Sequence, residues 1–243
     1  MKNKILAATK PAMAPVLDPG FQPAILAVRD FQKAVKESGK GVPLAIAVER
    51  EDGLIATYKS LIFDKDSGYE EECCFFAERI VKTLLWLYGG WKVVIGGPEY
   101  IGRYIEAAYK PGGLREFDAK FMSRVYEKPF TVIVTDADKV PAAKNNSMPI
   151  GRHLDGCRIG FDAGGSDRKV SAVIDGKAVY SEEVVWHPKL QSDPEYHYKE
   201  ILNAMKTAAA HMPRVDAIGV SSAGIYINNR VMVASLFIKV PDD

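Results

Sequence analysis

Apolar positions recur along the first part of the chain at spacings that alternate between those of helices and those of strands. Residues 1–23 carry several prolines and should be extended or loosely ordered, because proline removes a backbone donor and restrains its neighbour. The spacing then predicts a helix over 24–38, strands over 44–48 and 54–63, a helix over 69–88, a strand over 91–95, helices over 99–109 and 114–126, and a buried strand over 130–135. The Asp52-Gly53 pair favours a tight turn between the first two strands.

The pattern restarts at residue 158, after a polar, proline-containing stretch over 136–152 that has the composition of a connection between domains. It predicts strands over 158–162, 170–174 and 177–186, a helix over 194–212, a strand over 216–220 and a strand pair over 226–237. Turns are expected at Asp175-Gly176 and at Asn228-Asn229. We therefore predict two α/β domains with mixed sheets and flanking helices, 1–150 and 151–243.

The two parts share an order of elements. Segments 44–97 and 158–224 each give a hairpin, a long helix, a short apolar strand and a turn of small residues. Duplication would produce this order, but short α/β units also converge on it, and we favour the second explanation.

Composition narrows the classes of function. The 243 residues are 47% hydrophobic, and 32 basic and 31 acidic residues are mixed along the chain, so bulk charge does not favour nucleic acid or an anionic membrane. No run approaches the ~20 apolar residues of a membrane-spanning helix. Cys73, Cys74 and Cys157 fit neither a disulfide framework nor ordinary zinc spacing, which suits a reducing cytoplasm.

A glycine-containing turn between two predicted strands is the sharpest candidate for chemistry. Gly164 and Gly165 should allow positive φ and a close approach of backbone amides to an anion, and Ser166 adds a hydroxyl donor. Asp162 could hold Mg²⁺ through water at the end of its strand, and Arg168 or Lys169 could face phosphates. A plain hairpin with solvated charges is the alternative. A strand, not a helix, follows the turn, which excludes Walker and Rossmann loops.

A second candidate segment, 215–224, delivers small residues to the carboxyl end of an apolar strand, where ligands of α/β sheets bind. Ser221, Ser222 and Gly224 would line it, although a turn that needs small residues is the simpler interpretation. The sequence around the two serines is also similar to a nucleophile elbow. No helix follows, however, and no histidine comes after His211 in the sequence, so a hydrolase is disfavoured. His187 and His197 have no common metal-ligand spacing and are expected to be solvated.

Together the two segments resemble the ROK family of sugar kinases and sugar-responsive repressors, within the actin and hexokinase type ATPase superfamily. That family opens its nucleotide-binding lobe with a strand ending in Asp-x-Gly-Gly-Thr, then two strands, a helix, and a strand running into Gly-x-x-x-x-Gly. Residues 162–166 match the first motif with Ser166 in place of threonine, and Gly219 and Gly224 match the second. The resemblance covers about residues 158–240 and leaves 1–150 unexplained.

The resemblance implies an incomplete actin-like ATPase (ribonuclease H-like) lobe that binds ATP and Mg²⁺, in a parent protein that phosphorylates a sugar hydroxyl. The family's catalytic aspartate lies in an Asn-Asp pair, which this sequence lacks, so we expect a truncated chain that is inactive alone. The alternative is a non-catalytic sugar-sensing or assembly module. A sugar is the expected partner, nucleic acid and membrane are not, and a homodimer is allowed.

Overall fold

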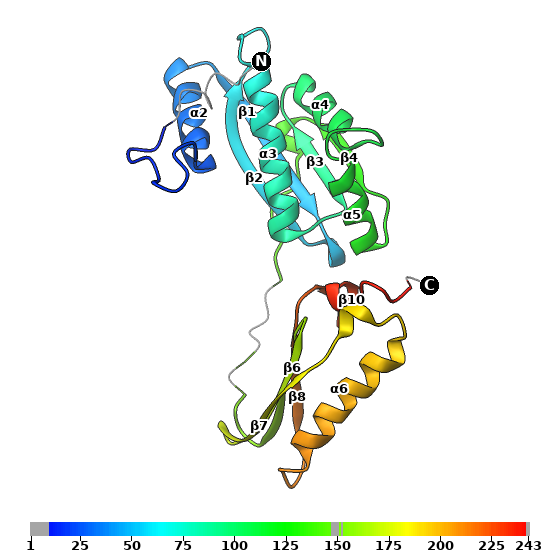
Figure 1. Ribbon diagram of the computed structural model, residues 1–243. Coiled ribbons are helices and arrows are strands. Elements are labelled where there is room, and N and C mark those ends of the chain that lie inside the picture. Colours follow the sequence, from blue (N-terminus) through cyan, green and yellow to red (C-terminus); the bar gives the residue numbers. More distant parts are fainter. Residues whose placement is uncertain (1–9, 147–150, 152, 242–243) are drawn as a thin grey trace. The chain divides into compact units, whose positions relative to one another are not determined.

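The computed structural model describes residues 10–146, 151 and 153–241. The chain divides into two compact units, 1–147 and 148–243, and each is described by itself (Figure 1). Residues 10–23 contain no helix or strand, and the remainder of the proline-rich segment lies outside the described residues.

The first unit is built on a four-stranded sheet with the order β2-β1-β3-β4. Strand β1 (Gly41–Glu49) pairs antiparallel with β2 (Ile55–Phe63) and with β3 (Lys92–Gly96), and β4 (Thr131–Thr135) runs parallel to β3. The predicted turn between β1 and β2 is confirmed, since Asp52 and Gly53 take φ values of 59° and 64°.

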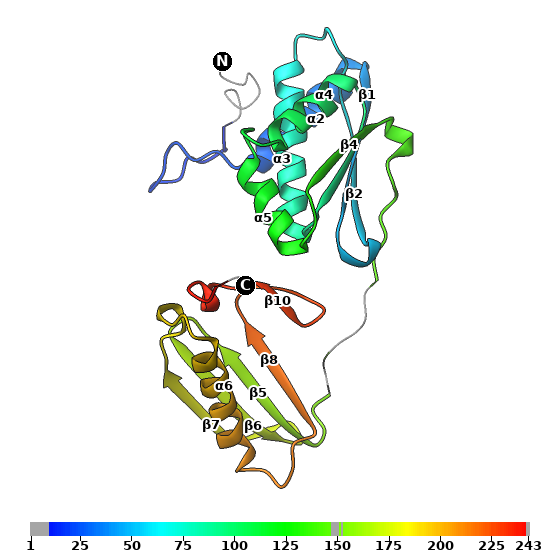
Figure 2. The same cartoon turned by 90° about the vertical axis from the view of Figure 1, so that its right-hand side faces the viewer.

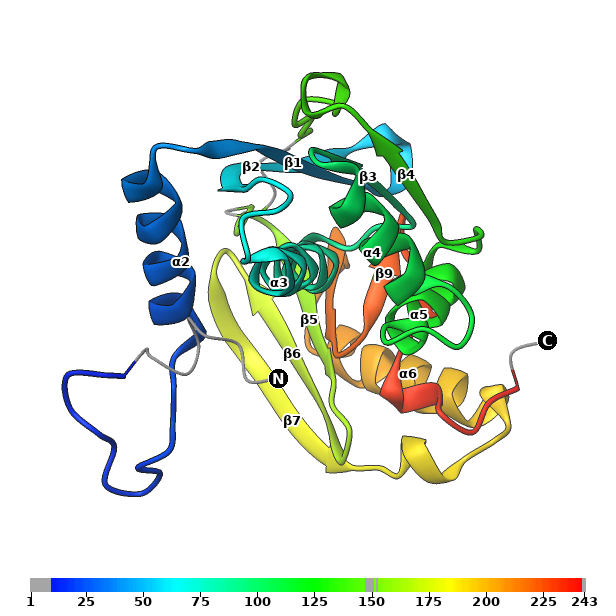
Figure 3. The ribbon, with the colours of Figure 1, turned by 90° about the horizontal axis from the view of Figure 1, so that it is seen from above.

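Helices cover one face of this sheet. They are α2 (Ala24–Ser38), α3 (Glu70–Tyr88), α4 (Glu99–Tyr109) and α5 (Glu116–Tyr126), and Figure 3 shows α3, α4 and α5 on the same side of the strands. Ile46 and Val48 of β1 are fully buried, while Ala45 and Ala47 face the other way and pack with Val140, which follows a short 3₁₀ turn (Ala137–Lys139). The alternation of β1 thus fills a core on both faces of the sheet.

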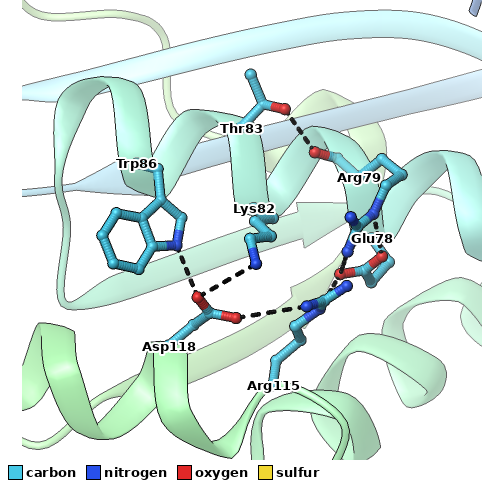
Figure 4. A network of polar contacts seen from close by, with 7 residues as sticks. All are labelled: Glu78, Arg79, Lys82, Thr83, Trp86, Arg115 and Asp118. Carbon is cyan, nitrogen blue, oxygen red and sulfur yellow. Dashed lines mark hydrogen bonds and ion pairs between the residues drawn. The ribbon is translucent and has the colours of Figure 1, made fainter. Parts of the chain in front are cut away.

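A buried network of charged groups joins α3 to α5 (Figure 4). Glu78 is 2% exposed and accepts two hydrogen bonds from Arg79 at 2.6 Å and one from Arg115. Asp118, also buried, accepts the indole N–H of Trp86 at 2.6 Å. Because each buried carboxylate has charged or N–H donors, the network satisfies groups that would otherwise be costly to desolvate.

The prediction that 130–135 is a buried strand is wrong. β4 is one of the two edge strands of its sheet, and Ile133 is 45% exposed. Its continuous β-branched sequence, Thr-Val-Ile-Val-Thr, has the same composition as a central strand, so the pattern alone did not distinguish the two positions.

The second unit contains a sheet with the order β7-β6-β5-β8. Strands β5 (Cys157–Ala163), β6 (Asp167–Ile174) and β7 (Lys177–Val185) pair antiparallel in sequence, and α6 (Pro194–Ala209) returns the chain to β8 (Ala217–Ser222), which lies parallel to β5. This is the order of strands and helix expected from the resemblance, and the mixed α/β fold class is confirmed (Figure 2).

One face of this second sheet packs on α6. The core there consists of alternate residues of the strands together with small residues of the helix: Ile159, Phe161, Val170, Ala172, Trp186, Ala204 and Ala208. We call the opposite face of the sheet the open face, since no helix among the described residues of this unit covers it in Figure 1. The predicted turns are confirmed by positive φ at Asp175 and Gly176, and at Asn228 and Asn229 between β9 (Ile225–Ile227) and β10 (Arg230–Val233).

The shared order of elements does not extend to the topology of the two units. β3 is antiparallel to β1, whereas β8 is parallel to β5. A duplication would preserve strand direction, so the similarity of order reflects a general α/β habit.

Candidate functional site

The turn between β5 and β6 is held in place by Trp186. The indole N–H donates to the Gly164 carbonyl at 2.8 Å, and the Trp186 backbone N–H donates to the Ser166 carbonyl at 3.1 Å. The ring is 1% exposed within the core under α6. Two of the three carbonyls of the turn therefore accept hydrogen bonds from Trp186. In the described part of the chain, the Gly165 and Ser166 amides donate to no backbone carbonyl.

Gly164 and Gly165 do not adopt the positive φ that glycine was expected to allow here, since neither is among the described residues with that conformation. Instead, the absence of a side chain at these two glycines lets other atoms of the protein lie close to the backbone of the turn. A Cβ on Gly164 would lie 2.4 Å from the Asp167 carbonyl oxygen, and one on Gly165 would lie 2.8 Å from the tip of Lys189. The turn is thus compact because side chains are absent, and a ligand could reach its backbone.

The strand register brings the two predicted segments together on the open face. Asp162 of β5 is level with Lys169 of β6 on one side and with Ser221 of β8 on the other. The carboxyl ends of β5 and β8 meet at this edge because the strands are parallel. Asp162 and Ser221 therefore stand side by side next to the 164–166 turn.

Glycines form the floor of a depression beside this row. Gly160 and Gly219 are partners in the next row of the sheet, and no atom lies within 4 Å of the place where a Gly219 Cβ would be. The depression has a volume of about 440 Å³, and hydroxyl groups of Ser171 and Ser181 line it together with Ser221. Small and hydroxylic residues leave room for a polar ligand.

Arg168 does not face this depression, which corrects the sequence-based expectation. Side chains on β6 point alternately to the two faces of the sheet, and Arg168 points to the face that packs on α6. There it is 4% exposed, and its Nε lies 3.0 Å from Glu200 Oε2. The sequence pattern placed Arg168 before a strand predicted to begin at residue 170, but β6 begins at Asp167 and fixes the direction of each side chain that follows.

Lys169 lies on the open face and is surrounded by acidic groups. Its Nζ is 2.6 Å from Asp167 Oδ2 and 3.8 Å from Glu183 Oε1, and these contacts, the Asp167 hydrogen bond first, raise the pKa of Lys169. With Asp162 in the same row, three carboxylates share one ammonium group. The local balance is therefore acidic, which favours a cation beside any anionic ligand.

The carboxyl group of Asp167 is expected to titrate near pH 2 in the folded protein. Hydrogen bonds from Lys169 and then from Ser166 lower its pKa from 3.8 to about 2. Because the folded pKa is depressed, the stabilisation that it provides is present above about pH 4 and is lost as the pH falls toward 2. A side-chain NMR titration should show this pKa, and Lys169→Met should return it toward 3.8. An unchanged pKa in the variant would contradict the assignment.

The serines of the second segment point to different faces. Ser221 lies on the open face with Asp162, whereas Ser222 is level with the buried Ala163 and so faces the α6 side, which removes it from the row. Its Oγ is buried and has no hydrogen-bond partner in the part of the chain that the structure describes. Gly224 supports the turn into β9, because a Cβ there would lie 2.8 Å from the Val233 carbonyl oxygen.

His197 is buried, which corrects the expectation that it is solvated. It is 2% exposed on α6, and its Nε2 lies 3.1 Å from the Pro188 carbonyl oxygen and 3.2 Å from that of Leu236. Sequence reasoning also missed Trp186. The available signal was that this is the only tryptophan after residue 91 and is the last residue of a predicted strand.

The open face offers oxygen donors suited to Mg²⁺. Magnesium is commonly held by one or two carboxylates and retained water molecules, and Asp162 with the adjacent Ser221 hydroxyl fits this donor set. No cluster of three or more His, Cys, Asp or Glu that could hold a metal by itself occurs among the described residues. Within the same residues, no helix is both long and apolar enough to span a membrane.

Comparisons with known proteins give little further guidance. No family model matches the chain, and no curated protein matches it. It is similar to the structure of an exopolyphosphatase from Cytophaga hutchinsonii, with 13% identity, a TM-score of 0.22, and coverage of 74% of this chain and 63% of that one. It is also similar to the Ppx/GppA phosphatase of Aquifex aeolicus, with 12% identity, a TM-score of 0.20 and coverage of 74% and 63%. At these TM-scores the likeness determines neither fold nor activity.

Proposed function

We propose that the open face of the second unit binds the phosphate groups of ATP together with Mg²⁺. The observation that carries the proposal is the register of β5 and β8, which sets Asp162 beside Ser221 at the carboxyl ends of parallel strands. The adjacent turn presents the Gly165 and Ser166 amides, whose neighbouring carbonyls are held by Trp186. Converging amides and hydroxyls are the groups that cradle phosphate oxygens.

Charge makes the proposed binding dependent on magnesium. Asp162, Asp167 and Glu183 outnumber the ammonium groups of Lys169 and of Lys189, whose tip lies beside Gly165, so a free triphosphate would meet net repulsion. Magnesium held by Asp162 would neutralise part of the phosphate charge and orient the phosphates. The residues of this chain would supply the position of the nucleotide, through the turn amides and the Ser221 hydroxyl.

The reaction served by this site is, in our proposal, transfer of a phosphoryl group to a sugar hydroxyl. It rests on the resemblance of 158–240 to ROK sugar kinases. A general base must accept the hydroxyl proton in such a transfer. The family places that base in an Asn-Asp pair, and this sequence has none, so the described residues are assigned nucleotide binding alone.

A non-catalytic role in sugar sensing or assembly is the second candidate. One observation favours it. Arg168 is buried and bonds Glu200, and Lys169 forms ion pairs with acidic side chains. Neither basic residue next to the turn is therefore directed to a phosphate. In that case the turn would have a purely structural role, and the protein would bind a sugar with an affinity that ATP does not change.

Calorimetric titration with ATP and Mg²⁺ tests the proposal. We expect binding to the wild-type chain, a loss of affinity of ~10-fold or more in Asp162→Asn, equivalent to about 1.4 kcal/mol, and no binding when EDTA removes the metal. Asp175→Asn is the matched control, because Asp175 sits in the β6–β7 turn, where asparagine also tolerates positive φ. Equal affinity for ATP in the Asp162 variant, or binding of a sugar but not of ATP, would reject the nucleotide site.

A further inference from the structure

β4 is an unprotected edge strand in the first unit. Its sequence from Thr131 to Thr135 contains no charge and no proline, and no described strand pairs with its outer edge (Figure 3). β2, at the opposite edge of the same sheet, carries Lys59, and β7, one of the two edge strands of the other sheet, carries Lys177, Glu182 and Glu183. Charged residues and prolines are the usual means of preventing edge-to-edge association, so β4 has the properties of a strand that acquires a partner.

The sequence of β4 reads the same in both directions. In an antiparallel pair of two such strands centred on Ile133, Thr131 would face Thr135 of the second copy, Val132 would face Val134, and Ile133 would face itself. β-branched pairs and threonine pairs are favourable opposite one another in antiparallel sheets. A two-fold axis at Ile133 therefore gives a self-complementary strand pair.

The exposed charged residues of α4 would also match those of a second copy across a two-fold axis close to Ile133. Glu99, Arg103, Glu106 and Lys110 alternate in sign along the exposed side of the helix. When two copies of α4 run antiparallel, this order sets Glu99 against Lys110 and Arg103 against Glu106 of the other copy. Opposite charges then meet at every position of the stripe.

Contacts between α4 and β4 show that Ile133, the centre of the strand, lies level with the middle of the charged stripe on α4. Gly102 lies against Val134, where a Cβ would come within 2.3 Å of Cγ1, and the rings of Tyr109 and Phe130 stack at 5.3 Å. Ile133 is therefore level with the part of α4 just beyond Gly102, close to the centre of the charge stripe. Beside the strand, an open groove of about 510 Å³ lined by Arg103, Glu106, Lys110, Phe130 and Val132 has room for side chains of a second copy.

We propose that the first unit forms a two-fold symmetric dimer in which β4 pairs antiparallel with β4 of a second copy of this chain, joining two four-stranded sheets into one. A five-residue strand pair and one helix face form a small interface, so association is concentration-dependent. This inference is independent of the nucleotide site, which lies on residues of the second unit.

Sedimentation velocity of the full chain over a range of concentrations tests the dimer. The wild-type mass should rise toward twice the monomer value, and Ile133→Lys should remain monomeric because it sets two like charges opposite each other at the axis. Val179→Lys, at a 49% exposed position on β7, is the matched control and should still dimerise. Circular dichroism checks that each variant is folded. A monomeric wild-type chain at every concentration, or an Ile133→Lys variant that still dimerises, overturns the proposal.

Register and charge are tested by two further sets of variants. Oxidation should crosslink Ile133→Cys to itself, and should crosslink Thr131→Cys to Thr135→Cys in a mixture more readily than either alone. Arg103→Glu should weaken the dimer, and the double swap Arg103→Glu with Glu106→Arg should restore it. Crosslinking that ignores these pairings, or a double swap that restores nothing, would contradict the two-fold arrangement.

Discussion

Replacing Trp186 with alanine is expected to lower the free energy of unfolding of the second unit by roughly 3–5 kcal/mol, the range for removing a large aromatic side chain from a core. The ring is 1% exposed, and its indole N–H bonds the Gly164 carbonyl. Denaturation followed by far-UV circular dichroism measures the loss. The variant should also expose the amides of β5 and β6 to faster hydrogen exchange, because the turn between these strands loses its anchor.

Trp186→Phe separates the two roles of this side chain. It keeps most of the apolar volume and the backbone hydrogen bond to Ser166, but it leaves the Gly164 carbonyl without the indole donor. We expect a smaller loss of stability, of about 1–2 kcal/mol, together with weaker binding of ATP and Mg²⁺. Full ATP affinity in the alanine variant would show that the turn does not need Trp186 for its conformation.

Glu78→Ala is expected to destabilise the first unit by about 3–5 kcal/mol, because it removes one member of a buried ionic network and leaves its partners uncompensated. Arg115 is 18% exposed and would lose its nearest carboxylate, while Arg79, at 35%, could turn to solvent. Urea denaturation followed by fluorescence measures the change, because Trp86 and Trp91 lie in the first unit and report its unfolding. Trp186, in the second unit, contributes a signal that the substitution should leave unchanged.

The matched control for this variant is Glu37→Ala. Glu37 pairs with Lys33 on the surface of α2, where the two side chains are 65% and 72% exposed, so its removal should cost less than about 1 kcal/mol. Equal effects of the two substitutions would mean that burial of the Glu78 network contributes nothing to the stability of the unit.

Local patterns predicted the elements of both units well. The α4 helix was predicted at its observed bounds, and the Asp175-Gly176 and Asn228-Asn229 turns take the expected positive φ, because spacing and turn chemistry are properties of neighbouring residues. Whether a strand lies at the centre or the edge of a sheet depends on pairing between distant residues. The β-branched sequence of β4 is compatible with both, which is why its exposure was not predicted.

The candidate site shows the same division. Motif spacing placed Asp162 at the end of one predicted strand and Ser221 directly after another, and the register of β5 and β8 sets these two residues side by side. It did not reveal that Arg168 points into the core, since that depends on where β6 begins and on Glu200 from α6. The role of Trp186 was also hidden, because its hydrogen bond to Gly164 spans 22 residues.

Amide NMR spectra recorded during titration with ATP and Mg²⁺ test most directly whether the turn at 164–166 and the end of β8 bind phosphate together. We expect the signals of Gly165, Ser166 and Ser221 to shift together and to saturate at one concentration, and we expect Asp162→Asn to suppress these shifts. Shifts confined to residues of the first unit, or none at these three amides, would contradict it.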